Sequence, residues 1–189
     1  MVANTTRSKI RSAALSLFVS KGIKETTTRD LAKKARIAEG TIYRHYVSKD
    51  ELVQDLFEGH FLAFCRDLDR VQAEAKPGID HKLKAMIDYM CRLHDSDRTL
   101  YQFLLVIQHD ALPRMGERES SPLTVLRKVL SDAIRRREIP AQDVHLTAAM
   151  IMGAVIQPAI ALIYGSLQGR MTKFSPLICG ACRRIVHAR

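Results

Sequence analysis

Residues 26–46 constrain the fold of this chain more than any other segment, because they read as two short helices with a tight break between them. In the first of these helices, the small side chains of Ala32 and Ala35 allow a second helix to cross closely. In the second, Ile42 and Tyr46 are one helical turn apart and are expected to pack inward together. This pattern predicts a helix-turn-helix, which indicates DNA binding rather than catalysis.

The outward face of the second helix carries groups that can reach a base edge or a phosphate. In a helix-turn-helix, the N-terminal part of the second helix lies in the major groove. There Arg44 can read guanine or hold a phosphate, and Thr41 can touch a thymine methyl or a phosphate. Tyr43, His45 and Lys49 are placed for backbone contacts, which fix register without reading sequence. The alternative is an ordinary helical hairpin with a solvated, mildly basic face. The candidate DNA-binding residues are Thr28, Arg29, Thr41, Tyr43, Arg44, His45 and Lys49.

Segment 7–60 as a whole resembles the N-terminal DNA-binding domain of the TetR/AcrR family of bacterial repressors. The resemblance rests on an ordered series of segments, which is far more specific than a lone helix-turn-helix. These segments are 14–22, 26–35, 40–46 and 48–52. By position, the resemblance implies that Thr28, Thr41, Tyr43, His45 and Lys49 lie at the DNA backbone or in the groove.

The turn departs from the family pattern at two positions. Arg36 stands where the family usually has glycine, and Ala38 stands where a serine or threonine cap is frequent. We therefore expect Arg36 to adopt a left-handed backbone conformation, at a cost of about 1 kcal/mol relative to glycine. Thr28 is the expected N-cap of the first helix of the motif, because its hydroxyl can accept from an amide in the first turn.

Charge is concentrated in the same part of the chain. The net charge is +10, and residues 1–50 hold 11 Lys and Arg against 4 Asp and Glu, a net of +7. A basic N-terminal quarter on a nearly neutral remainder is typical of one nucleic-acid-binding module joined to another domain. A generally basic protein would spread its charge more evenly. We therefore predict a helix-turn-helix DNA-binding domain at residues 1–50 and a separate domain at residues 51–189, which the resemblance implies is a helical ligand-binding and dimerisation domain.

Beyond residue 47 the apolar spacing is helical nearly throughout, so the predicted fold class is all-α, a three-helix head followed by a helical bundle. The longest apolar stretch, 148–164, is shorter than the about 20 residues that a membrane helix needs. The first apolar stretch, 13–19, is too short for a signal peptide. We therefore expect no membrane partner, a cytoplasmic location and reduced cysteines.

The last two long helices, 142–167 and 172–187, are apolar and rich in small residues. The helical domain of one subunit need not bury both of them completely. The resemblance implies that they pair with their twofold mates as a four-helix dimer interface. A homodimer would place two recognition helices one DNA turn (~34 Å) apart, as a palindromic operator requires.

The candidate metal, redox and catalytic residues are better explained as structural residues. Cys179 and Cys182 lie three residues apart on one helix, which suits neither a disulfide nor a metal site without further ligands. The histidines lack metal-binding spacing, and no nucleophile elbow, phosphate loop or carboxylate pair occurs in the sequence. We therefore predict no enzyme activity, no cofactor and no bound metal.

An effector site is expected inside the helical body, because such sites are often apolar cavities between helices. The candidates are Phe64, Tyr89, Met90, Phe103, Ile107, Gln108, His109, Leu126 and Gln157. The resulting hypothesis is a homodimeric repressor that a small apolar or aromatic effector releases from its operator. The alternative is a DNA-binding regulator without such an effector, either constitutive or controlled by a protein partner.

Overall fold

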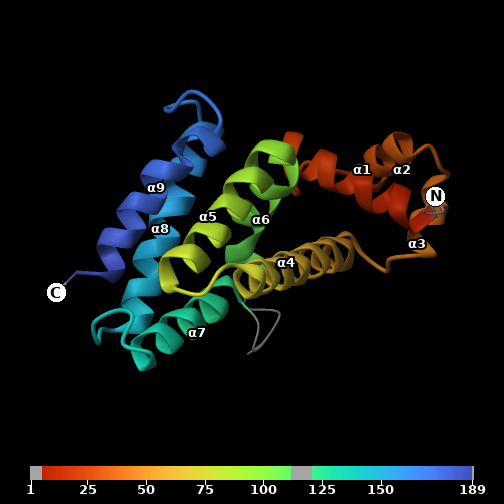
Figure 1. The fold of residues 1–189 in the computed structure, drawn as a ribbon. Coiled ribbons are helices and arrows are strands. Elements are labelled where there is room, and N and C mark those ends of the chain that lie inside the picture. The colour runs from red at the N-terminus through yellow and green to blue at the C-terminus, as the bar shows by residue number, and fades with distance from the viewer. Residues whose placement is uncertain (1–5, 112–120, 189) are drawn as a thin grey trace. The chain divides into compact units, whose positions relative to one another are not determined.

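The computed structural model describes residues 6–111 and 121–188, with the side chains of residues 106–111 left aside. Within these two stretches every regular element is an α-helix, in agreement with the predicted all-α class (Figure 1). The helices are α1 (Thr6–Ser20), α2 (Thr28–Ala35), α3 (Glu39–Tyr43), α4 (Lys49–Glu74), α5 (Ile79–Ser96), α6 (Arg98–Ala111), α7 (Pro122–Arg135), α8 (Val144–Ile163) and α9 (Met171–Val186).

The chain divides into two compact units, and the division falls inside α4. One unit comprises residues 1–61 with residues 99–116, and the other comprises residues 62–98 with residues 117–189. These two units are defined by which residues pack together and not by function. The expected division into functional domains at residue 50 therefore stays a prediction.

The N-terminal unit is built around a close crossing of α1 and α2. Ala13 and Ala14 of α1 are buried, as are Ala32 and Ala35 of α2, so small side chains occupy both sides of this crossing. Phe18 of α1 stacks on Phe103 of α6, with ring centroids 6.5 Å apart, which explains why α6 belongs to this unit. Burial of such side chains is the main driving force for folding of the unit.

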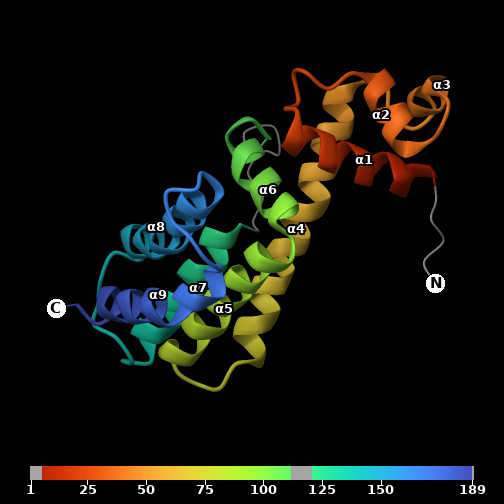
Figure 2. The same ribbon diagram turned by 90° about the horizontal axis from the view of Figure 1, so that it is seen from above.

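The C-terminal unit is a bundle in which α5, α7, α8 and α9 pack together. Both views show α8 and α9 side by side, and α5 also packs against α9 (Figures 1 and 2). On α5 the buried side chains, Leu83, Met86, Ile87 and Met90, recur at helical spacing and form one apolar face. The helix α8 continues through Pro158.

Among the described residues, α8 is the one helix whose length and composition would allow it to cross a membrane. Its residues Ile151, Val155 and Ala159 are buried against the rest of the bundle. A helix in the core of a bundle meets the same criteria of length and composition. The apolar character of α8 is therefore weak support for a membrane segment.

Candidate DNA-binding interface

The helix α2 begins with a capping box. The N-cap is Thr27, one residue before the expected Thr28, so that prediction was wrong by one position. The Asp30 amide donates to the Thr27 hydroxyl at 3.1 Å, and the Thr27 amide donates to the Asp30 carboxylate at 2.9 Å. Lys21 pairs with the same carboxylate at 2.6 Å. Hydrogen bonds from Lys21 and Thr27 hold the pKa of Asp30 well below its usual range. The first turn of α2 is therefore fixed from both sides.

The end of α2 is a Schellman motif with arginine at the left-handed position. The backbone angles of Arg36 are φ 56° and ψ 51°, which confirms the expected left-handed conformation. The Arg36 amide donates to the Lys33 carbonyl at 3.3 Å, and the Ile37 amide donates to the Ala32 carbonyl at 3.1 Å. Ala38 then begins α3 without a side-chain cap, also as expected. The turn thus adopts a left-handed helix end with arginine in place of glycine.

The recognition helix α3 is short, with only five residues, but its inward face is firmly packed. Ile42 of α3 is buried, and so is Tyr46, which lies three residues beyond the end of the helix, so both point inward as predicted. Arg44 and His45 are exposed, the side chain of Tyr43 is 56% exposed, and Thr41 is half-buried. The predicted groups on this segment are therefore available to a DNA surface.

A polar cluster joins the first turn of α2 to α3. The Thr28 hydroxyl donates to the Glu39 carboxylate at 2.8 Å, and the Tyr43 hydroxyl lies 3.4 Å from the Thr28 hydroxyl, to which it donates. The structure thus brings together two predicted DNA-binding residues, Thr28 and Tyr43. It also places beside them the Glu39 carboxylate, which is not among the predicted DNA-binding groups. Arg29 is exposed next to this cluster in the chain.

A second network, which the sequence did not reveal, ties α1, the end of the recognition segment and α4 together. Asp55 of α4 accepts from Arg7 at 3.1 Å, from the Tyr46 hydroxyl at 2.8 Å, and from Arg11. The Arg7 guanidinium also lies over the Tyr46 ring, 5.5 Å from its centroid. Burial opposes ionisation of Asp55, but the Tyr46 hydrogen bond and both guanidinium charges outweigh it and lower the pKa of Asp55. This charged hub fixes the base of the recognition segment.

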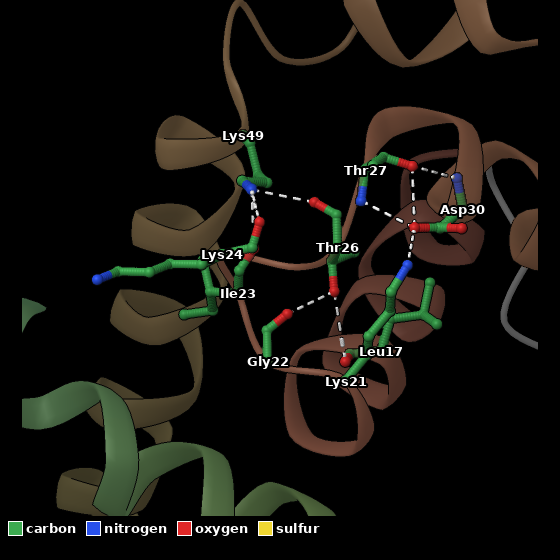
Figure 3. Close-up of polar contacts among 9 residues, drawn as sticks. All are labelled: Leu17, Lys21, Gly22, Ile23, Lys24, Thr26, Thr27, Asp30 and Lys49. Atoms are coloured by element: carbon green, nitrogen blue, oxygen red, sulfur yellow. Dashed lines mark hydrogen bonds and ion pairs between the residues drawn. The ribbon is translucent and has the colours of Figure 1, made fainter.

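Lys49, the first residue of α4, faces the loop between α1 and α2. Its ammonium donates to the carbonyls of Ile23, Thr26 and Lys24, with Nζ–O distances of 2.7, 3.0 and 3.3 Å (Figure 3). Its side chain is half-buried. Of the predicted DNA-binding residues, Lys49 therefore stands apart, because its charged group is bonded to the protein's own backbone.

The expected effector residues fall into different surroundings. Phe64 and Tyr89 stack with ring centroids 5.9 Å apart, and the Tyr89 hydroxyl donates to Asp67 at 3.0 Å. Burial, followed by that hydrogen bond, raises the pKa of Tyr89. Met90, Leu126 and Phe103 are buried, and Phe103 belongs to the N-terminal unit. Gln157 is exposed on α8. The side chains of Ile107, Gln108 and His109 lie outside the described residues.

The two C-terminal cysteines lie on α9 in different surroundings. Cys179 is half-buried near the Ser175 hydroxyl, whose oxygen is 3.8 Å from its sulfur, and Cys182 is fully buried. Burial raises the pKa of Cys182 to about 11, so this group is a thiol at neutral pH. In the described parts of the chain no three potential metal ligands cluster together.

Comparison with known proteins supports this reading of the N-terminal unit. Residues 10–56 match the family model of bacterial regulatory proteins of the tetR family. The transcriptional repressor KstR2 of Mycobacterium tuberculosis is 38% identical over 76 residues, which span 39% of this chain and only 38% of that repressor. The transcriptional regulator SrpR of Pseudomonas putida is 24% identical over 182 residues, covering 89% of this chain and 78% of the regulator.

The whole fold also resembles that of a solved regulator. The transcriptional regulator FadR of Bacillus subtilis, solved in complex with stearoyl-CoA, superposes with a TM-score of 0.76 at 20% identity. The superposition covers 96% of this chain and 98% of FadR. At this identity the likeness shows the fold alone. Taken together, the helix-turn-helix geometry and the matched family model assign residues 10–56 to the tetR family of bacterial regulatory proteins, and the chain as a whole shares the fold of a solved regulator.

Proposed function

We propose that the protein is a homodimeric transcriptional repressor that binds a palindromic DNA operator. The observation that carries this proposal is the α2–α3 arrangement, in which a fixed helix start and a short recognition helix present polar and basic groups together. In this proposal Arg44 and Thr41 reach base edges or phosphates, whereas the other predicted side chains contact the DNA backbone. The proposed contacts are Thr28, Arg29, Thr41, Tyr43, Arg44 and His45.

The proposed dimer forms through α8 and α9. Support comes from large apolar side chains that these helices leave exposed, namely Leu146 and Met150 on α8 and Leu177 on α9. A groove between the two helices, lined in part by Leu146, Met150 and Ile185, adds further apolar surface. Twofold pairing of these helices would remove that surface from water.

Binding-site selection from random duplexes, followed by titration of the selected duplex, tests DNA recognition. Replacement of Tyr43 by alanine should weaken binding to the selected and to a scrambled duplex alike, because a backbone contact carries no sequence information. Replacement of Arg44 by alanine should also relax the sequence preference if it reads a base. Recovery of no preferred duplex, together with unchanged binding of both variants, would reject the proposal.

We further propose that a small apolar ligand in the helical body releases the DNA. The stacked pair of Phe64 and Tyr89 and the stearoyl-CoA bound to the similar FadR fold support this idea. Release requires that the ligand bind the DNA-free conformation more tightly than the DNA-bound one. The alternative remains a regulator that is constitutive or controlled by a protein partner. We also propose a cytoplasmic location and a role without catalysis.

Melting temperatures measured with a series of saturated acyl-CoAs and aromatic acids distinguish the two forms of control. A specific ligand raises the melting temperature in a concentration-dependent way, because it binds the folded state. The same compound should lower the affinity for the selected duplex. A melting temperature that no compound shifts would favour the alternative.

A further inference from the structure

One charged side chain from α4 binds the backbone of the segment between α1 and α2. Lys49 donates to three carbonyl oxygens of this segment, those of Ile23, Lys24 and Thr26, all within 3.3 Å of its nitrogen. In Figure 3, dashed lines join the ammonium to the carbonyl oxygens of these three residues. An isolated loop of this length would have many conformations. Here its backbone is fixed to the first residue of α4.

An ammonium group has three N–H donors and no acceptor. Three carbonyl partners therefore use the full donor capacity of Lys49, whose side chain is half-buried. To contact a phosphate, the side chain would have to give up at least one of these bonds. The geometry thus disfavours the phosphate contact that its sequence position suggests.

The bonded loop leads directly into the DNA-facing turn of α2. Thr26 is fully buried, and its hydroxyl donates to the Gly22 carbonyl at 2.7 Å while its own carbonyl accepts from Lys49. The next residue, Thr27, is the N-cap of α2, and Thr28 follows in its first turn. The Lys49 ammonium is therefore bonded to the residue that directly precedes the N-cap of α2.

We propose that Lys49 is a positioning residue, which fixes the N-terminus of α2 against α4 instead of binding a DNA phosphate. The expected effect of Lys49 on DNA affinity rests on the proposed function. The role of Lys49 in holding the loop before α2 does not depend on DNA binding. It separates Lys49 from the exposed Arg29, which remains a candidate phosphate contact.

The test compares Lys49→Ala and Lys49→Gln with Arg29→Ala as the matched loss of one positive charge. Affinity for the selected duplex is measured over a range of salt concentrations. The slope of log K against log salt is negative, and loss of one phosphate contact makes it shallower by about 0.9. We expect that change for Arg29→Ala, whereas Lys49→Ala should lose affinity about tenfold or more with an unchanged slope. Lys49→Gln should recover part of the loss, since its amide still donates to carbonyls.

Hydrogen exchange of the DNA-free protein provides the independent readout. In Lys49→Ala, amides of residues 26–30 should lose protection about tenfold, and Lys49→Gln should restore part of it. Unchanged protection together with a reduced salt slope in both Lys49 variants would overturn the proposal and make Lys49 a phosphate contact. If wild type and Arg29→Ala alike select no duplex, the proposed function fails, while the exchange result still decides the role of Lys49. Lys49→Gln covers the case in which the alanine variant does not fold.

Discussion

Asp95 of α5 and Thr172 of α9, 77 positions apart in the chain, form the N-terminal cap of α9. The Asp95 carboxylate accepts from the Thr172 amide at 3.0 Å and from the Thr172 hydroxyl at 2.6 Å. It also accepts from the Met171 amide at 2.8 Å. The residue in the N-cap position itself, Arg170, contributes no side-chain cap. The start of α9 is therefore held by a neighbouring helix.

The Asp95 cap predicts a specific pH dependence of stability. Burial opposes ionisation, but hydrogen bonds from Thr172 and Met171 outweigh it and hold the pKa of Asp95 well below its usual range. A depressed folded-state pKa contributes stability above the unfolded value, about 3.9, which is lost as the pH falls toward the folded value. Asp95→Asn should therefore lower the free energy of unfolding by about 1–2 kcal/mol at pH 7 and by less at pH 3.

Urea denaturation of wild type and Asp95→Asn between pH 7 and pH 3 measures this effect. Asp143, the exposed N-cap of α8, offers a matched control, because it caps a helix with its own side chain in solvent. Asp143→Asn should show a smaller pH-dependent difference. A difference between wild type and Asp95→Asn that stays constant over the whole range would contradict the assignment.

Glycine at two arginine positions should stabilise the protein. Arg36 and Arg137 both have left-handed backbones, with φ of 56° and 60°. Arg137 ends α7 in the same motif, since its amide donates to the Ile134 carbonyl at 2.9 Å and the Glu138 amide to the Ala133 carbonyl at 2.9 Å. Because glycine adopts this conformation without strain, each substitution should raise the free energy of unfolding by about 0.5–1 kcal/mol.

Arg136→Gly is the control for both glycine substitutions. Arg136 has an ordinary right-handed backbone with φ of −82°, so glycine there should lower stability or leave it unchanged. Chemical denaturation of the three variants makes the comparison. Equal effects at positions 136 and 137 would show that the left-handed backbone is not the cause.

Removal of the Glu39 charge should strengthen DNA binding. Glu39 is exposed on the face proposed to meet DNA, and its carboxylate accepts from the Thr28 hydroxyl at 2.8 Å. Glu39→Gln keeps an acceptor for this hydroxyl but removes the repulsion from phosphates, so affinity should rise about twofold to tenfold at low salt. The measurement is a titration of the selected duplex at two salt concentrations. A lower affinity would instead mean that the charge helps to orient Thr28 for its contact.

A charge on the outer face of α9 should separate the proposed dimer. Leu177 is 70% exposed, and Leu177→Glu would place a carboxylate at an apolar interface, which is costly without a partner. Sedimentation velocity should show at least a tenfold higher dimer dissociation constant. Leu123→Glu changes an exposed leucine on α7 and should leave association unchanged. Equal behaviour of the two variants would place the interface elsewhere.

The features that the sequence revealed are local in the chain. Helical periodicity made the all-α class predictable. The left-handed backbone of Arg36 followed from the family resemblance, in which glycine usually stands at this position. The N-cap of α2 was misplaced because Thr27 and Thr28 are both capable caps. The signal that distinguishes them was present, since Asp30 follows Thr27 by three residues, the spacing of a capping box.

The contacts that the sequence did not reveal join distant segments. Asp55 meets Arg7 across 48 positions, and Lys49 meets Ile23 across 26. Periodicity gives the face of a helix on which a residue lies, but not the partner that faces it. The role of Lys49 was therefore read from the family pattern, whereas its three bonds become visible only in the folded chain.

The first two turns of α4 hold all three preceding helices. Lys49 binds the loop that leads into α2, and Asp55 binds α1 through Arg7 and Arg11 and the end of the recognition segment through Tyr46. A rotation of this part of α4 would therefore carry the three helices with it as one rigid body. In the proposed dimer, loss of affinity for the proposed operator would then require only a changed separation of the two DNA-binding units, while each unit keeps its contact surface unaltered.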